Sequence, residues 1–325
     1  MNAMTYHRVV RIGTFAQDEL ARSRSGLILA ALSEAAYLLT ARRTLLWMTS
    51  HSGSMHRRSL RLSGLLPRLS PGTPFRAEDG RIRLDRTGTI DFSRATTWRP
   101  TPRHSELPGH RRLMTDRLIR FCARACADYE PLGFGALIPD ILRLTGACIQ
   151  GHRLDHSDPA LARAGPIVQA VAAAVFDSEP VRACQEAARL IGLGRGLTPS
   201  GDDFVGGLAF GLRNLVPEDQ LPSLLPALRR LRHDAREHTH LIGNVLLRDL
   251  TFGYGPEPLH ALMSASDWRR ADDEGVCGTD LLQLGHSSGW DMLAGLACAA
   301  LCGGQSPPAG EPAFGARPLV TLTVS

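Results

Sequence analysis

The 325-residue chain is long enough for two ordinary domains, and its hydrophobic residues (43%) are sufficient to build their cores. The formal net charge is +5, and every one of the 37 basic side chains is an arginine, because the sequence contains no lysine. Chemistry through a lysine Schiff base and the lysine of a Walker A loop are therefore excluded, which removes pyridoxal enzymes, class I aldolases and ordinary P-loop nucleotide hydrolases.

The charge is divided unevenly along the chain. Residues 1–125 carry 22 arginines against 9 acidic residues (+13), and residues 126–325 carry 15 against 23 (−8). A basic half is compatible with nucleic-acid binding, but these arginines are scattered and are not interleaved with aromatic residues. An acidic partner subunit, or the acidic half of the same chain, is the complement that we favour.

The chain is expected to be cytoplasmic. Its most apolar N-terminal stretch is interrupted by Glu34, Arg42 and Arg43, and no uninterrupted apolar run reaches the roughly 18 residues of a membrane span. Polar residues precede that stretch, which is unlike a signal peptide. The seven cysteines lack C-x-x-C spacing, so we expect small buried thiols and no disulfide or metal site at positions 122, 126, 148, 184, 277, 298 and 302.

The predicted elements give an α+β protein in two domains. Apolar residues at helical spacing predict one or two helices over residues 15–48, and short runs over 44–98, with a hairpin at "EDGRIRLD", predict a small antiparallel sheet or barrel. The proline-rich segment 99–110 is typical of a linker. We therefore expect a β-rich N-terminal domain over 1–105 and a mainly helical domain over 106–325. Its helices are predicted over 111–129, 135–150, 160–176, 179–191, 202–213, 220–250, 257–265, 278–284 and 291–302, and the tail 310–325 is predicted to return to the sheet as a strand.

The segment "GLGRGLTPSGDDF", residues 192–204, stands out between two helical patterns. Ser200 with Asp203 three residues later has the spacing of a capping box, so a well-capped helix start explains part of it. The surplus of glycines before the cap indicates that the backbone comes close to a ligand. Gly206 and Gly207 each cost the helix about 1 kcal/mol relative to alanine, which indicates close helix packing or ligand approach.

An internal sequence repeat, the echo, strengthens the interpretation of this segment as a functional site. "SGDDFVGGL" (200–208) aligns without a gap with "SGWDMLAGL" (288–296), pairing Asp203 with Asp291 and Gly207 with Gly295. Two such loops, each opening a helix, predict a single site in which unpaired N–H groups of both helix N-termini bind an anion. A single site requires that the loops lie within about 15 Å of each other.

The residues between the echoes leave alternatives open. His233, His238 and His240 suggest a metal site but match no established zinc spacing. Thr239 and Asn244 are instead expected to point at the same cleft as the loops. Two adjacent carboxylates beside a phosphate would also suit Mg²⁺, so a magnesium ion at Asp202 and Asp203 is an alternative to a site without cofactor.

The motifs "GLGRGLTPSGDDF", "EPLHALM" and "GHSSGWDMLAGL" resemble the AllH-type subunit of oxamate carbamoyltransferase over residues 185–300. The resemblance implies a subunit of an enzyme of anaerobic allantoin breakdown, a branch of purine catabolism. That enzyme transfers the carbamoyl group of oxalurate to phosphate, giving oxamate and carbamoyl phosphate. It implies FdrA-like and AllG-type partner subunits. Family members often have proline where this chain has Arg195, and the segment 239–244 lacks the hydroxyl-rich form expected there.

The residue types in and around the two loops suggest which of them bind the substrate and which take part in the reaction. Small anionic substrates require oriented donors, and transfer requires a stabilised oxyanion and proton donors or acceptors. The predicted catalytic residues are Asp202, Asp203, Asp291 and His286. The predicted anion-binding residues are Gly194, Arg195, Gly196, Thr198, Ser200, Gly201, Ser287, Ser288, Gly289, Thr239 and Asn244. The competing hypothesis is a non-catalytic metabolite-binding or scaffold subunit whose partner carries the chemistry.

Overall fold

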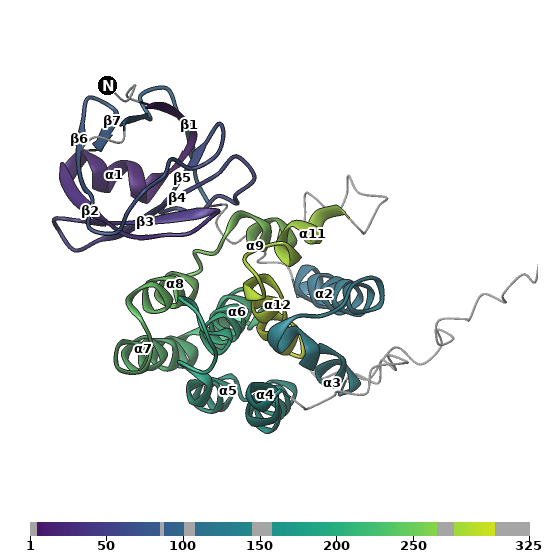
Figure 1. The fold of residues 1–325 in the computed structure, drawn as a ribbon. Helices are drawn as coiled ribbons and strands as arrows, with labels where there is room; N and C mark the ends of the chain where they lie inside the picture. Colours follow the sequence, from purple (N-terminus) through teal and green to yellow (C-terminus); the bar gives the residue numbers. More distant parts are fainter. Residues whose placement is uncertain (1–4, 85–87, 101–107, 145–157, 265–275, 303–325) are drawn as a thin grey trace, which may run out of the picture.

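The computed structural model describes residues 5–84, 88–100, 108–144, 158–264 and 276–302. A β-barrel is followed by a bundle of helices, so the predicted α+β class is confirmed (Figure 1). The change from strands to helices falls between Trp98 and Pro108. The predicted domain boundary at residue 105 and the predicted C-terminal strand lie outside the described residues.

The barrel is one nine-stranded sheet in the order β5-β4-β3-β2-β6-β7-β8-β1-β9. Pairing of β5 with β1 closes eight strands into the barrel, and β9 lies outside the closed ring beside β1. The strands are β1 (Thr5–Gly13), β2 (Ser25–Ala31), β3 (Ala35–Thr40), β4 (Leu45–Thr49), β5 (Ser59–Leu62), β6 (Pro74–Glu78), β7 (Arg81–Leu84), β8 (Gly88–Asp91) and β9 (Thr96–Trp98).

Alternation of side chains fills the barrel. In β7, Ile82 and Leu84 enter the barrel core while the arginines between them face outward. The expected hairpin is present: β6 and β7 pair antiparallel across Asp79 and Gly80, which both have a positive φ. The helix α1 (Thr14–Arg22) adds Ala16 and Leu20 to the same core.

The prediction of one or two helices over residues 15–48 is wrong beyond α1. Residues 25–49 form β2, β3 and β4 instead, and in β3 buried and half-buried side chains alternate strictly. Leucine and alanine at this density satisfy the helical period and the strand period at once. Pairing with neighbouring strands decided the outcome, because it closes the barrel and satisfies the backbone hydrogen bonds of all three segments.

The remaining helices follow the predicted order, with one correction. They are α2 (Pro108–Asp128), α3 (Ile138–Arg143), α4 (Pro159–Phe176), α5 (Pro180–Ala187), α6 (Ser200–Leu215), α7 (Leu221–His238), α8 (Leu241–Thr251), α9 (Glu257–Leu262), α11 (Val276–Leu282) and α12 (Ser288–Ala299), with 3₁₀ turns at Gly133–Leu137, Ala188–Leu190 and Glu218–Gln220. The single helix predicted over 220–250 is two helices, because Thr239 is extended (φ −133°, ψ 171°) and ends α7.

Helices α6 and α12 lie in the middle of the helical part, with α2, α3, α4, α5, α7 and α8 around them (Figure 1). By length and composition alone, α4 is apolar enough to cross a membrane. In this structure its three valines, Ile167 and three of its alanines, Ala164, Ala172 and Ala174, pack into the helical core. The five described cysteines are free thiols, and four are buried as expected: Cys122, Cys126, Cys184 and Cys298.

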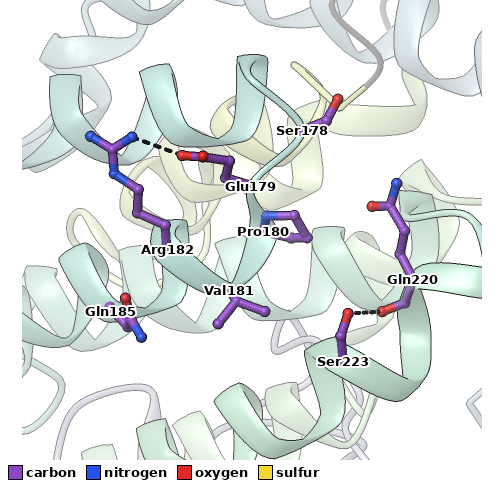
Figure 2. Close-up of a pocket in the computed structure, with 8 residues that line it drawn as sticks. All are labelled: Ser178, Glu179, Pro180, Val181, Arg182, Gln185, Gln220 and Ser223. Atoms are coloured by element: carbon purple, nitrogen blue, oxygen red, sulfur yellow. Dashed lines mark hydrogen bonds and ion pairs between the residues drawn. The ribbon is translucent and has the colours of Figure 1, made fainter.

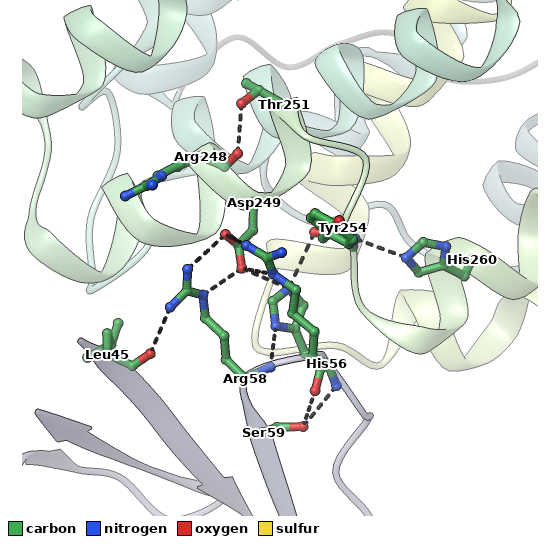
Figure 3. Close-up of polar contacts among 11 residues, drawn as sticks. Leu45, His56, Arg58, Ser59, Arg248, Asp249, Thr251, Tyr254 and His260 are labelled. Atoms are coloured by element: carbon green, nitrogen blue, oxygen red, sulfur yellow. Dashed lines mark hydrogen bonds and ion pairs between the residues drawn. The ribbon is translucent and has the colours of Figure 1, made fainter. Parts of the chain in front are cut away.

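The barrel docks on the helices through Asp249 of α8 (Figure 3). This fully buried carboxylate accepts two hydrogen bonds from Arg57, at 2.9 and 2.7 Å, and two from Arg58, at 2.6 and 3.0 Å. Burial acts to raise the pKa of Asp249, but the two guanidinium groups outweigh it and hold that pKa below its usual value. A second contact joins Arg11 of β1 to Glu257 of α9 through paired bonds of 3.0 and 2.8 Å.

Candidate functional site

The two echoed segments pack against each other through their glycines. A Cβ at Gly207 would overlap the carbonyl oxygen of Met292, and a Cβ at Gly295 would overlap that of Phe204. These paired positions of the echo therefore lie at the crossing of α6 and α12, where only glycine allows the two backbones to come so close. The expectation of close helix packing at Gly207 is confirmed.

The loops before the helices repeat the same geometry. The N–H of Gly201 donates to Leu193 O at 2.8 Å, and the N–H of Gly289 donates to Leu284 O at 3.0 Å. A Cβ on either glycine would overlap a leucine carbonyl oxygen, of Leu190 and Leu281 respectively. Gly201 and Gly289 are thus required by the folding of each loop against its helix, whether or not a ligand binds.

The expectation of unpaired N–H groups needs correction for part of each helix start. Besides Gly201 and Gly289, the N–H groups of Asp202 and Asp203 are occupied, both by Pro199 O, at 2.9 and 3.2 Å. Pro199 is the N-cap residue and Ser200 already belongs to α6, so the predicted capping box is not formed. Within the described residues, no acceptor is bonded to the N–H of Ser200 or of Ser288, the first residue of each helix.

The two loops meet at their hydroxyl groups. Thr198 Oγ1 lies 3.2 Å from Ser288 Oγ, well inside the separation that a shared site requires. Thr198, Ser200 and Ser288 are all half-buried, so their hydroxyls remain within reach of a ligand. The structure thus brings the N-terminal turns of α6 and α12 together, as the echo predicts.

Asp202 is held on both sides by the protein. Its Oδ1 accepts the N–H of Gly192 at 2.8 Å, and its Oδ2 accepts the hydroxyl of Thr239. Burial raises the pKa of Asp202, although these two hydrogen bonds act against the rise. The break between α7 and α8 therefore places the Thr239 hydroxyl against Asp202, at the start of α6.

Asp291 is also held on both sides. Its Oδ1 accepts the N–H of Phe134 at 2.6 Å, from the 3₁₀ turn Gly133–Leu137, and its Oδ2 accepts the hydroxyl of Ser287 at 2.9 Å. Burial raises the pKa of Asp291 to about 6, although Phe134, Ser287 and the Ser200 hydroxyl act to lower it. Gly133, at φ +54°, lets the turn approach this carboxylate. The sequence reasoning missed this turn, and "LGFG" was its only signal.

Asp203 differs from its neighbours, because its Oδ2 is buried and has no hydrogen-bond partner among the described residues. Burial raises the pKa of Asp203 well above its usual value, and the negative charges of Asp291 and Asp202 raise it further. The hydroxyls of Ser288 and Thr198 lie close enough to act in the opposite direction. Burial therefore favours the protonated form of Asp203, and its unpartnered Oδ2 lies near the hydroxyls where the loops meet.

The other predicted residues lie further out. Gly194, Arg195, Gly196 and His286 are exposed on the loops. Positive φ values explain Gly194 and Gly196 as turn residues, and a Cβ at Gly194 would come within 2.7 Å of Ser200 N. Asn244 is half-buried on α8, and the structure shows no hydrogen bond between its amide and either loop.

The histidines of α7 bond to groups on their own helix. His233 lies near Asp234 and Glu237, and His238 Nδ1 lies 2.9 Å from Asp234 O. Over the part of the chain that the structure describes, no three histidine, cysteine or acidic side chains are arranged to hold a metal ion. A hollow of about 510 Å³ is found elsewhere, at the start of α5, and none of the predicted site residues lines it; Figure 2 shows its lining residues, from Ser178 to Ser223.

Comparison with known families finds a match for the segment that carries this site. Residues 190–300 match the family described as oxamate carbamoyltransferase subunit AllH. This segment is therefore similar to the AllH-type family. It contains both loops, α6 and α12, so the resemblance expected over 185–300 is confirmed, and the family name implies a subunit of a larger complex. The barrel lies outside the AllH-type segment, no curated protein matches the chain, and no solved structure matches it.

Proposed function

We propose that this chain is the oxamate carbamoyltransferase subunit that binds the small carboxylate substrate where its two loops meet. The open Oδ2 of Asp203 carries the proposal, because a buried, unpartnered polar atom in a native fold indicates a missing partner. Its surroundings supply donors: the hydroxyls of Thr198 and Ser288, and the N–H groups of Ser200 and Ser288 at two helix N-termini. Arg195 is exposed on the first loop.

Protonation resolves an apparent conflict in this site. An anion beside ionised carboxylates would be repelled, but burial raises the pKa of Asp203 and so favours its neutral form. A neutral carboxyl donates a hydrogen bond to a substrate carboxylate or to an oxyanion, as other buried acids do in enzymes. Asp202 and Asp291, whose oxygens are already bonded, hold the loops in place around it.

The proposed reaction balances with these groups. A phosphate oxygen attacks the ureido carbonyl carbon of oxalurate, a tetrahedral oxyanion forms, and the C–N bond to the oxamate nitrogen breaks. Hydrogen phosphate loses one proton and the leaving nitrogen gains one, so an acid that relays a proton is sufficient. The carboxyl of Asp203 is our candidate for this relay, and the hydroxyl and N–H donors stabilise the oxyanion. No metal ion is required by this scheme.

The AllH-type resemblance supplies the cellular setting of this chain. The chain would act in the cytoplasm, in allantoin breakdown, together with FdrA-like and AllG-type subunits. The alternative is a subunit that binds the metabolite without reacting on it. One observation favours this alternative: both oxygens of Asp202 and of Asp291 are engaged by the protein, which leaves Asp203 as the one predicted catalytic carboxylate with an open oxygen.

The test is to purify the chain with its partner subunits and to measure carbamoyl phosphate formed from oxalurate and phosphate. We expect Asp203→Asn to lower kcat by at least roughly 100-fold, the contribution of a positioned acid. Exposed Asp280 on α11 supplies the matched control, Asp280→Asn, which should leave the rate unchanged. If Asp203→Asn retains full activity, the catalytic proposal fails. If it also binds oxamate normally, the binding proposal fails as well.

A further inference from the structure

A threonine and an arginine lie side by side on the outside of the barrel. Thr49 of β4 and Arg61 of β5 are direct partners in the parallel register of these two strands. Leu60 and Leu62 enter the barrel core, and so does Met48, which leaves Arg61 and Thr49 on the outer face. The two side chains therefore project from neighbouring positions of one surface.

Both side chains carry a buried polar atom that is not satisfied by the protein. The hydroxyl of Thr49 and the Nε of Arg61 make no hydrogen bond within the part of the chain that the structure describes. Thr49 is only 8% exposed, whereas the rest of the Arg61 side chain is half-buried. Buried polar groups of native proteins are almost always hydrogen-bonded. Two such atoms on directly paired residues therefore indicate that one partner binds to both.

The charges on this surface indicate the sign of that partner. On its other side, Arg61 is paired in register with Arg11 of β1, next to a bulge in that strand. Like charges directly opposite each other on one face destabilise a sheet. Glu257 of α9 neutralises Arg11 through two hydrogen bonds, at 3.0 and 2.8 Å. Among the described residues, no acidic side chain forms an ion pair with Arg61. One positive charge is therefore left uncompensated, and an anion would neutralise it.

The turn after β4 limits the size of the partner. The N–H of Gly53 donates to Ser50 O at 3.1 Å, and a Cβ at Gly53 would come within 2.3 Å of the Thr49 Cβ. The turn thus closes over Thr49, and access is from the side of half-buried Arg61, whose flexible side chain can turn to admit a ligand. The place suits an ion of a few atoms better than a side chain that brings its own backbone.

We propose that Thr49 and Arg61 form a second anion site, on the barrel, which binds a small free oxyanion, either a carboxylate or a phosphate. The guanidinium of Arg61 donates charge-assisted hydrogen bonds, and its planar fork matches two oxygens of either group. The hydroxyl of Thr49 donates a further bond. The site is separate from the two loops, because both of its residues belong to the barrel, which lies outside the AllH-type segment.

The direct test follows the Nε–H signal of Arg61 in the NMR spectrum of the full chain, assigned by its absence from Arg61→Lys. Inorganic phosphate and oxamate are titrated separately. We expect at least one of the two ions to shift the signal until it saturates, and the ion that acts at the lower concentration identifies the source of the oxyanion. No shift with either ion overturns the proposal. A shift that appears only when the partner subunits are added also overturns it, because a carboxylate of another chain would then be the occupant.

The variant Thr49→Val tests the hydroxyl while preserving the shape of the side chain. The ion concentration that half-saturates the Arg61 signal should rise roughly 10-fold, as for the loss of a hydrogen bond to a charged group. The matched control is Arg83→Gln, because Arg83 and Arg76 are also paired in register on the outside of the barrel but are both exposed. This control should leave the titration unchanged. An unchanged titration in Thr49→Val would overturn the proposal.

Stability without the ion gives a second measurement. In buffer free of phosphate and carboxylates, Thr49→Val should unfold at the same urea concentration as the unmodified chain or at a higher one, because it removes a buried hydroxyl that has no partner there. Added ion should then stabilise the unmodified chain more than the variant. If Thr49→Val is less stable in the absence of the ion, its hydroxyl is satisfied by the protein itself and the proposal fails.

Discussion

Gly295 of α12 lies so close to Phe204 of α6 that a Cβ at position 295 would overlap the Phe204 carbonyl oxygen. A backbone atom cannot move aside as a side-chain tip can, so Gly295→Ala forces the two helices apart. We expect this substitution to lower the free energy of unfolding by about 1–3 kcal/mol, the usual range for overpacking. Urea denaturation measures the change.

Gly206 is the matched control on α6. A Cβ there would meet Cδ1 of Leu250, the end of a flexible side chain that can rotate away. Alanine also favours the helix by about 1 kcal/mol relative to glycine. Gly206→Ala is therefore expected to leave stability within about 1 kcal/mol of the unmodified chain. If both variants lose the same stability, the close backbone crossing at Gly295 is not what α6 and α12 depend on.

The sequence predicted this crossing because the echo repeats a chemical requirement. Gly207 and Gly295 recur at matching positions since each lies against the other helix, and Gly201 and Gly289 recur since each loop folds back on its own helix. The echo could not show which N–H groups stay open. That depends on loop hydrogen bonds such as Gly201 N–H to Leu193 O, which have no signature in residue type.

Asp249 joins the barrel to the helices, so replacing its carboxylate should lower the free energy of unfolding. Asp249→Asn removes the charge that compensates Arg57 and Arg58, leaving two guanidinium groups at a junction without their partner. Breaking a buried ion pair typically costs about 3–5 kcal/mol. Thermal unfolding of Asp249→Asn checks this expectation. The control is Glu179→Gln, which breaks an exposed ion pair with Arg182 and should change stability by less than about 1 kcal/mol.

The prediction of helices over residues 15–48 concealed the outer face of β3. Tyr37 falls within that range, whereas Leu45 and Trp47 fall also within the run 44–98 that predicts a sheet. Even correct strands would not have been sufficient, because the partner of Arg58 is Asp249, which is 191 residues away in the chain. The two loops were recognised because all their chemistry is local. The docking of the barrel on the helices arises from tertiary contacts alone.

Asp291 should make stability depend on pH. Its pKa is about 6 in the folded chain and about 4 when unfolded, so the folded state binds more protons between these values. The contribution of Asp291 to the free energy of unfolding is fully present below about pH 4. It is lost as the pH rises through 6, a change of about 3 kcal/mol. Asn cannot ionise, so Asp291→Asn should be less destabilising at pH 7 than at pH 4, by that amount.

The comparison must be between variant and unmodified chain at each pH. His56, whose pKa burial lowers to about 4, gives stability the opposite pH dependence and would mask the effect of Asp291 in a single curve. Urea denaturation at both pH values gives the difference. Exposed Asp280 provides the control, since Asp280→Asn should show no such change. An equal destabilisation by Asp291→Asn at pH 4 and pH 7 would contradict a raised pKa.

Thr239 ends α7, and its hydroxyl donates to Asp202 Oδ2 beside the first loop. Thr239→Val preserves the shape of the side chain but leaves that buried oxygen without a donor, which should lower the free energy of unfolding by about 1–3 kcal/mol. Thr239→Ser retains the hydroxyl and should be milder. Because Asp202 also accepts the N–H of Gly192, the loop itself should loosen in Thr239→Val. We expect oxamate binding to weaken in Thr239→Val and to be retained in Thr239→Ser. Equal binding by the two variants would show that Asp202 does not hold the loop in its binding form.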